Sequence, residues 1–315
     1  MSARSRGVPD RDFRCASASV LRDEPLAGTA STVRAFLLVE NTGPWGVDAL
    51  RDSRLSAGVG PALRSASAAA RVRVLMIRRP DRLRHQRGMR IFGAYADPAR
   101  PRLEAGVITD PRELLDLDLA RLGTGESLGL QKVGEPLLCV CTHGRHDACC
   151  AERGRPVVAA LAQAHPEETW EVSHIGGDRF AGNLLVLPHG LYYGRLDPVT
   201  ALSVAGAHRS GQLDLDHLRG RSGYAMPVQF AEIALRRELA ETREGALRLT
   251  SRRVARGGDG GGGGDVTTVV FEVAGAAWQV RVRAAPGADL WQLTCKATRE
   301  NPIPSYQVLD VARVK

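Results

Sequence analysis

The cysteines of this chain are concentrated in one short segment. Four of the six lie within the twelve positions from Cys139 to Cys150. Six cysteines in 315 residues are too few for a disulfide scaffold, and their close spacing indicates metal ligation or thiol redox chemistry in a reducing compartment. Cys141 ends an apolar run and Cys150 begins a helical pattern. The eight-residue loop between them can bring the two sulfurs together, and a helix start favours the thiolate that binds metals.

A second loop, 24 positions after Cys150, offers two further donors. The sequence HIGGD lies between two predicted strands and contains an imidazole and a carboxylate. Glycines in both loops permit tight backbone turns around an ion, namely Gly144, Gly176 and Gly177. Two loops at one end of a sheet therefore predict a site with four candidate ligands, which are Cys141, Cys150, His174 and Asp178.

Neighbouring residues are interpreted as support for these loops. Hydrogen bonds to the ligand loops, or a docking surface, are expected of Arg145, Asp147 and Arg179. Asn183 is expected to close the turn into the following strand. Cys139 alternates with the first candidate ligand on one predicted strand and is interpreted as a small buried hydrophobic residue.

The predicted elements fall into two similar halves. The first half has the order strand, helix, strand, strand and helix, at residues 32–40, 47–70, 72–78, 89–95 and 111–119. The second half begins with a strand at 136–141, a helix at 151–165 and a strand at 169–173. Two further strands lie within 184–193. This order predicts an α/β fold of two related units, followed by an amphipathic helix over 227–243.

The C-terminal part is expected to differ from these units. The glycine-rich segment 257–264 predicts a flexible linker. Alternating runs beyond it predict a small antiparallel sheet, at residues 267–273, 278–283, 291–296 and 306–311. The expected ranges are two α/β units at 1–125 and 126–245, a linker at 246–265 and a β segment at 266–315.

Composition restricts the classes of function. The net charge is +8, but the arginines are scattered and no aromatic residues are interleaved with them, so nucleic acid is not an expected partner. No apolar stretch approaches the roughly 18 residues that cross a bilayer. No apolar run of signal-peptide length follows the basic amino terminus. These features predict a cytoplasmic protein without a membrane role.

Two segments resemble a known family. They are CTHGRHDACCAERGRP, at 141–156, and WEVSHIGGDRFAGNLLVLPHGLYYGRL, at 170–196. Both resemble bacterial members of the sucrase/ferredoxin-like family, which is related to thioredoxin-like ferredoxins, and the upstream segment 15–55 is similar as well. The resemblance implies two thioredoxin-like α/β units with a 2Fe-2S cluster held by the second.

The family pattern implies two cysteine ligands in the first loop and two histidine ligands in the second. Three of these positions match, at Cys141, Cys150 and His174. The second histidine position holds Asp178, whose carboxylate can ligate iron although it is a harder donor than sulfur or nitrogen. Cys149 or His143 could substitute for it. Alternatively, the two loops could bind zinc in tetrahedral geometry or remain a thiol site without a cluster.

What the resemblance implies is a one-electron carrier that exchanges electrons with unidentified donor and acceptor proteins. Histidine ligands remove negative charge and so raise the reduction potential above that of all-cysteine ferredoxins. A carrier fits better than a catalyst, because the chain has no CxxC motif and no evident pair of carboxylates for sucrose hydrolysis. The alternative is a zinc-stabilised or cluster-less thioredoxin-like protein that binds partners or exchanges thiols.

Overall fold

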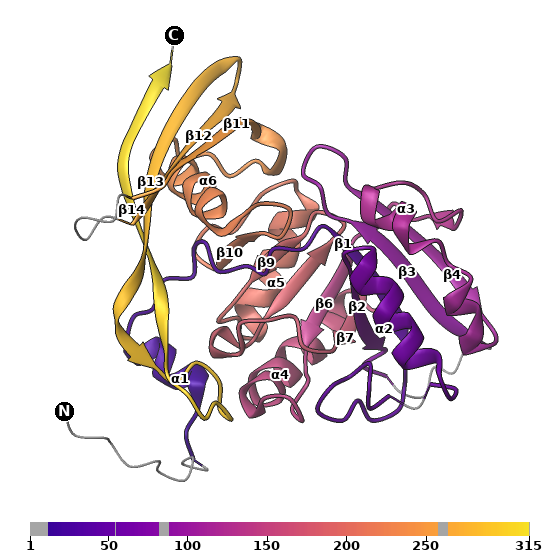
Figure 1. Ribbon diagram of the computed structural model, residues 1–315. Helices are drawn as coiled ribbons and strands as arrows, with labels where there is room; N and C mark the ends of the chain where they lie inside the picture. The colour runs from indigo at the N-terminus through magenta and orange to yellow at the C-terminus, as the bar shows by residue number, and fades with distance from the viewer. Residues whose placement is uncertain (1–11, 54, 82–87, 258–263, 315) are drawn as a thin grey trace.

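A ten-stranded mixed sheet forms the centre of the computed structural model, which describes residues 12–53, 55–81, 88–257 and 264–314 (Figure 1). Helix α1 (Cys15–Leu21) precedes the sheet. The first half then contains β1 (Ala35–Glu40), α2 (Val59–Ala69), β2 (Val72–Arg78), β3 (Met89–Tyr95), β4 (Arg102–Ile108), the 3-10 helix η1 (Pro111–Leu115), α3 (Leu119–Thr124) and β5 (Gln131–Lys132). The second half contains β6 (Leu137–Cys141), α4 (Ala148–Ala164), β7 (Thr169–Val172), η2 (Asp178–Phe180), β8 (Leu184–Leu187), β9 (Leu191–Tyr193), α5 (Pro198–Arg209), β10 (Leu218–Arg221) and α6 (Met226–Glu238).

The two halves repeat one strand order within this sheet. The full order is β10-β9-β8-β6-β7-β2-β1-β3-β4-β5. In the first half β1 lies between parallel β2 and antiparallel β3, and in the second half β6 lies between parallel β7 and antiparallel β8. The halves join where β2 pairs with β7 in antiparallel orientation, with Ile77 opposite Val172 and Arg78 opposite Glu171. The predicted α/β class is therefore confirmed.

Apolar residues cover both faces of the central strands. In β1 the sequence AFLLVE places Phe36 and Leu38 in one buried cluster and Leu37 and Val39 in another. A strand that is buried on both faces has a continuous apolar sequence instead of an alternating one. The same holds for β6, whose five residues LLCVC are all buried. The ligand-bearing loops thus start from strands held on both sides by the core.

A separate four-stranded antiparallel sheet follows α6 (Figure 1). After the 3-10 helix η3 (Glu244–Ala246) it contains β11 (Leu247–Ala255), β12 (Asp265–Val273), β13 (Ala276–Trp291) and β14 (Asn301–Val314). The predicted small antiparallel sheet is confirmed. Its inner face packs on α6 through Val228 and Leu235, which share a buried cluster with Phe271.

Several predicted bounds differ from the structure. The helix expected over 47–70 begins only at Val59, because Asp52 accepts the backbone N–H groups of Val47 and Asp48 and so favours a loop. The helix expected over 111–119 is divided into η1 and α3. β4, α5 and β10 were not predicted. Within the described residues, no helix combines the length and the apolar character needed to cross a lipid bilayer.

Two predictions for the C-terminal part need correction. The range 246–265 expected as a linker contains β11, an arginine-rich strand that pairs with β12 and exposes most of its residues. Most of the glycine run, 258–263, lies outside the described residues. The strand expected over 291–296 is a loop between β13 and β14, apart from the last residue of β13. An alternating apolar pattern of six residues is too short to distinguish an edge segment from a hairpin loop.

Candidate metal centre

Cys141 and Cys150 lie at the end of a strand and the start of a helix. Cys141 is the last residue of β6, and Cys150 is the third residue of α4. Asp147 begins the helix as its N-cap, since its Oδ1 accepts the N–H of Cys149 at 2.9 Å. Burial raises the pKa of Asp147 to about 6. Both candidate ligand cysteines are buried, and neither forms a disulfide with a described residue.

The two thiols differ in their proton affinity. A hydrogen bond from Cys150 lowers the pKa of Cys141, while the same contact together with burial raises the pKa of Cys150. The pair therefore holds one thiolate more readily than two. A metal ion would supply the positive charge that stabilises both thiolates at once.

The second loop brings His174 and Asp178 to these thiols. Gly176 and Gly177 have φ of +97° and +78°, values that only glycine adopts without strain. Oδ1 of Asp178 lies 3.1 Å from Sγ of Cys150 and 2.8 Å from Nδ1 of His174. Burial would raise the pKa of Asp178, but contacts with His174 and Cys150 hold it below its usual value. The structure thus places Cys150 and His174 beside the buried carboxylate of Asp178, while Cys141 is linked to this group through Cys150.

Nδ1 of His174 is buried, and Oδ1 of Asp178 is its close neighbour at 2.8 Å. This contact helps to hold the pKa of Asp178 low. Buried polar atoms in folded proteins are nearly always satisfied by protein, water or an ion. An ion that binds here would replace this contact between the imidazole and the carboxylate.

His146 is a further candidate ligand that the sequence analysis missed. Its ring stacks on that of His174 with centroids 3.8 Å apart, and its Nε2 lies 3.7 Å from Oδ2 of Asp178. Donor atoms of these three residues all lie within 4.8 Å of one another. Burial lowers the pKa of His146 and so favours the neutral imidazole, which is the form that binds metals. His146 lies in the eight-residue loop between the two cysteines, so its position in the sequence could have identified it as a candidate ligand.

The two substitutes expected from the sequence have other roles in the structure. His143 uses both ring nitrogens, because Nε2 lies 2.9 Å from the carbonyl oxygen of Gly46 and Nδ1 accepts the N–H of His174 at 3.2 Å. Burial lowers the pKa of His143, in keeping with a neutral ring that joins the two loops. The Cys149 thiol points to a different group, with Cys295 Sγ only 3.4 Å away.

The buried residue Arg219 of β10 fixes the second loop. Its guanidinium donates to the carbonyl of Gly176 at 3.0 Å, to Oδ1 of Asn183 at 2.8 Å and to the carbonyl of Thr29 at 2.6 Å. Burial lowers the pKa of Arg219 to about 10. A Cβ added to Gly177 would lie 2.2 Å from its terminal nitrogen. No sequence pattern marked this arginine.

The predicted supporting residues take several positions. Asn183 also donates to the carbonyl of Gly177 at 2.8 Å, so it holds the ligand loop and not only the turn that follows. Arg179 pairs with the buried Glu24 at 2.5 Å. Gly144 is required for packing, because a Cβ there would lie 2.7 Å from that of Ala151. Arg145 is exposed, and its carbonyl accepts a hydrogen bond from Lys296.

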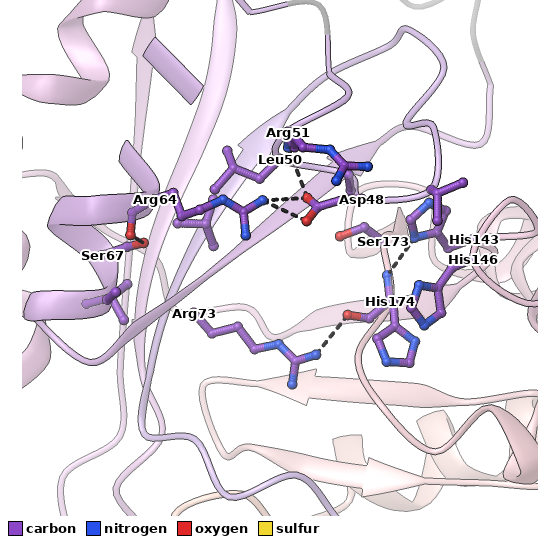
Figure 2. A pocket seen from close by; sticks show the side chains of 15 residues that line it. Asp48, Leu50, Arg51, Arg64, Ser67, Arg73, His143, His146, Ser173 and His174 are labelled. Atoms are coloured by element: carbon purple, nitrogen blue, oxygen red, sulfur yellow. Dashed lines mark hydrogen bonds and ion pairs between the residues drawn. The ribbon is translucent and has the colours of Figure 1, made fainter. Parts of the chain in front are cut away.

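A cavity of about 520 Å³ opens beside the histidines. Figure 2 shows His143, His146 and His174 together on one side, and Arg64 and Arg73 on the other. Arg64 pairs with Asp48 at 2.7 Å, and Arg73 donates to the carbonyl of His174 at 3.0 Å. The arginines and Asp48 come from the first half of the chain and the histidines from the second. The cavity therefore brings solvent to His174 and His146 at the junction of the two halves.

Comparison with known proteins identifies the family. Residues 26–220, which include both ligand loops, match the family described as sucrase/ferredoxin-like. No curated protein and no solved structure gives a match. Since the match covers more than half of the chain, the protein belongs to the sucrase/ferredoxin-like family.

Proposed function

We propose that this protein is a one-electron carrier that binds a 2Fe-2S cluster between its two ligand loops. The observation that supports the proposal most directly is the convergence of Cys141, Cys150, His174 and Asp178 in a member of this family. Its donor and acceptor would be redox proteins of the cytoplasm, a reducing compartment in which cysteines persist as thiols. When bound, the cluster accepts one electron and returns it.

The donor set suits such a cluster. Cys141 and Cys150 would hold one iron, because their thiols are within hydrogen-bonding reach of each other. His174 and Asp178 would hold the other iron, since their side chains lie 2.8 Å apart. Soft sulfur and imidazole donors are the ligands of such clusters.

The surrounding residues would tune the electron transfer. Burial of both thiols excludes water from the sulfurs, whereas the His174 side chain is 27% exposed and lines the cavity. An imidazole ligand with a solvent-accessible second nitrogen can take up a proton when an electron arrives. A ligand aspartate keeps its negative charge, so the reduction potential would be lower than with two histidines.

Metal analysis of the anaerobically purified chain tests this proposal. We expect about two irons and two sulfides per chain, a brown-red colour, and visible absorbance that dithionite bleaches as it donates an electron. A colourless, iron-free protein would contradict the proposal. Zinc bound in place of iron, without sulfide, would favour the alternative of a zinc-stabilised binding or thiol-redox protein.

The fourth ligand has its own test. Asp178→His should raise both the iron content and the reduction potential, because an imidazole replaces a charged, harder donor. His146→Asn should leave the iron content unchanged if Asp178 is the ligand. Loss of iron in His146→Asn, with no gain in Asp178→His, would instead identify His146 as the ligand.

A further inference from the structure

Three cysteines other than Cys141 and Cys150 form a second cluster. Cys15 is the first residue of α1, Cys149 is the second residue of α4, and Cys295 lies in the loop between β13 and β14. Figure 1 shows the β13–β14 hairpin extending from the small sheet to α1. Three segments far apart in the sequence therefore bring their thiols to one point, which we call the three-cysteine cluster.

The sulfur atoms surround a common centre with Asp147. Sγ of Cys295 lies 3.4 Å from Sγ of Cys149 and 3.6 Å from Sγ of Cys15. The two carboxylate oxygens of Asp147 lie 3.6 and 3.7 Å from Sγ of Cys15. Donor atoms of all four residues are within 4.8 Å of one another.

These distances match the edges of a single tetrahedral zinc site. With Zn–S of about 2.3 Å and Zn–O of about 2.0 Å, the sulfur–sulfur edge is about 3.8 Å and the sulfur–oxygen edge about 3.5 Å. A disulfide requires an S–S distance of about 2.05 Å, and an odd number of thiols cannot all pair. We propose that Cys15, Cys149, Cys295 and Asp147 bind one Zn²⁺.

Backbone groups hold the donors in place. The N–H of Cys295 donates to Oδ2 of Asp147 at 2.7 Å, and the N–H of Cys149 donates to Oδ1 at 2.9 Å. The N–H of Cys15 donates to Sγ of Cys295 at 3.5 Å. Three of the four side chains are buried, and the fourth, Cys295, is intermediate. A closed site with four protein ligands is typical of structural zinc, which contributes to folding without reacting.

This zinc would join the ends of the described chain to the ligand loops. Cys149 is adjacent in sequence to Cys150, so a zinc ion at the three-cysteine cluster would fix the first turn of α4 and the loop before it. Arg14 supports the same contact by pairing with Glu152 of α4 at 2.8 Å. The proposal does not depend on which metal binds at Cys141 and Cys150.

The test is zinc, iron and sulfide analysis of the anaerobically purified full chain and three variants. We expect about one zinc per chain in the wild type, and the same amount in the double variant Cys141→Ser/Cys150→Ser, which lacks the other thiol pair. Cys295→Ser should lose zinc at least about tenfold. Cys139→Ser, at a buried cysteine outside both groups, should retain it.

A spectroscopic measurement distinguishes this site from the other. The double variant refolded with Co²⁺ should give the intense thiolate charge-transfer and visible bands of tetrahedral cobalt. Adding Cys295→Ser should remove most of these bands, because the lost thiolate weakens the binding of Co²⁺ as it does that of Zn²⁺. Absence of zinc from the wild type, loss of zinc in the double variant alone, or a disulfide between Cys149 and Cys295 would each overturn the proposal. Iron and sulfide in the same samples report separately on the proposed electron carrier.

Discussion

Cys150→Ala is expected to lose at least about nine-tenths of the bound iron and sulfide, and with them the visible absorbance. Alanine removes one of the two thiolates that would hold the first iron, and no other described thiol approaches that position, because Cys149 points to the three-cysteine cluster. Loss of even a group that only supports a metal ligand costs about 10–100-fold in affinity, so loss of the ligand itself should cost more. Iron, sulfide and absorbance are measured after anaerobic purification.

Cys139→Ala is the matched control. Cys139 lies on β6 two residues before Cys141, is fully buried, and has a pKa raised by burial, so it remains a neutral thiol. Its truncation leaves a small cavity that costs about 1 kcal/mol of stability without removing a ligand. Equal losses of iron in the two variants would point to a general packing defect. Retention of the cluster in Cys150→Ala would exclude this cysteine as a ligand.

Arg219→Met is expected to lower the free energy of unfolding by about 3–5 kcal/mol. Methionine fills much of the space but donates no hydrogen bond, so the carbonyls of Gly176 and Thr29 and the side chain of Asn183 lose their buried donor. Each buried acceptor left without a partner costs about 1–3 kcal/mol. Urea unfolding of the reduced, metal-free protein measures the change independently of cluster binding.

Arg209→Met provides the comparison for this change. Arg209 lies at the end of α5, is half exposed, and pairs with Glu168 at 2.7 Å. An exposed ion pair contributes about 0–1 kcal/mol, so the unfolding midpoint should move little. If both arginine variants lose similar stability, the hydrogen bonds of Arg219 do not hold the second loop as the structure indicates.

The sequence was sufficient for the features that depend on local pattern. Continuous apolar runs identified the central strands β1 and β6, since burial on both faces leaves a strong signal. Cys141 and Cys150 flank one short loop, and His174 and Asp178 lie four positions apart in another. Such spacing made a common site predictable, whereas the identity of the cluster came from the family resemblance and stays a prediction.

Features that depend on contacts between distant residues could not be predicted from local sequence patterns. Cys15 and Cys295 are 280 positions apart, and only the path of the β13–β14 hairpin brings them together. Cys295 was assigned to a strand because its neighbours alternate. Arg219 resembles any other arginine of a basic chain until the fold encloses it completely. Tertiary packing determines such contacts between residues far apart in the chain, and no local sequence pattern marks them.

The antiparallel β2–β7 pairing has a consequence for association between molecules. Two separate sheets would present four edge strands with unpaired backbone groups, which are templates for aggregation. Joining them leaves two edges among the described strands of the large sheet, β5 and β10. β5 is only two residues long and contains Lys132, both of which discourage a further strand from adding there. The fusion of the two halves thus removes two edges at which a strand of another molecule could add.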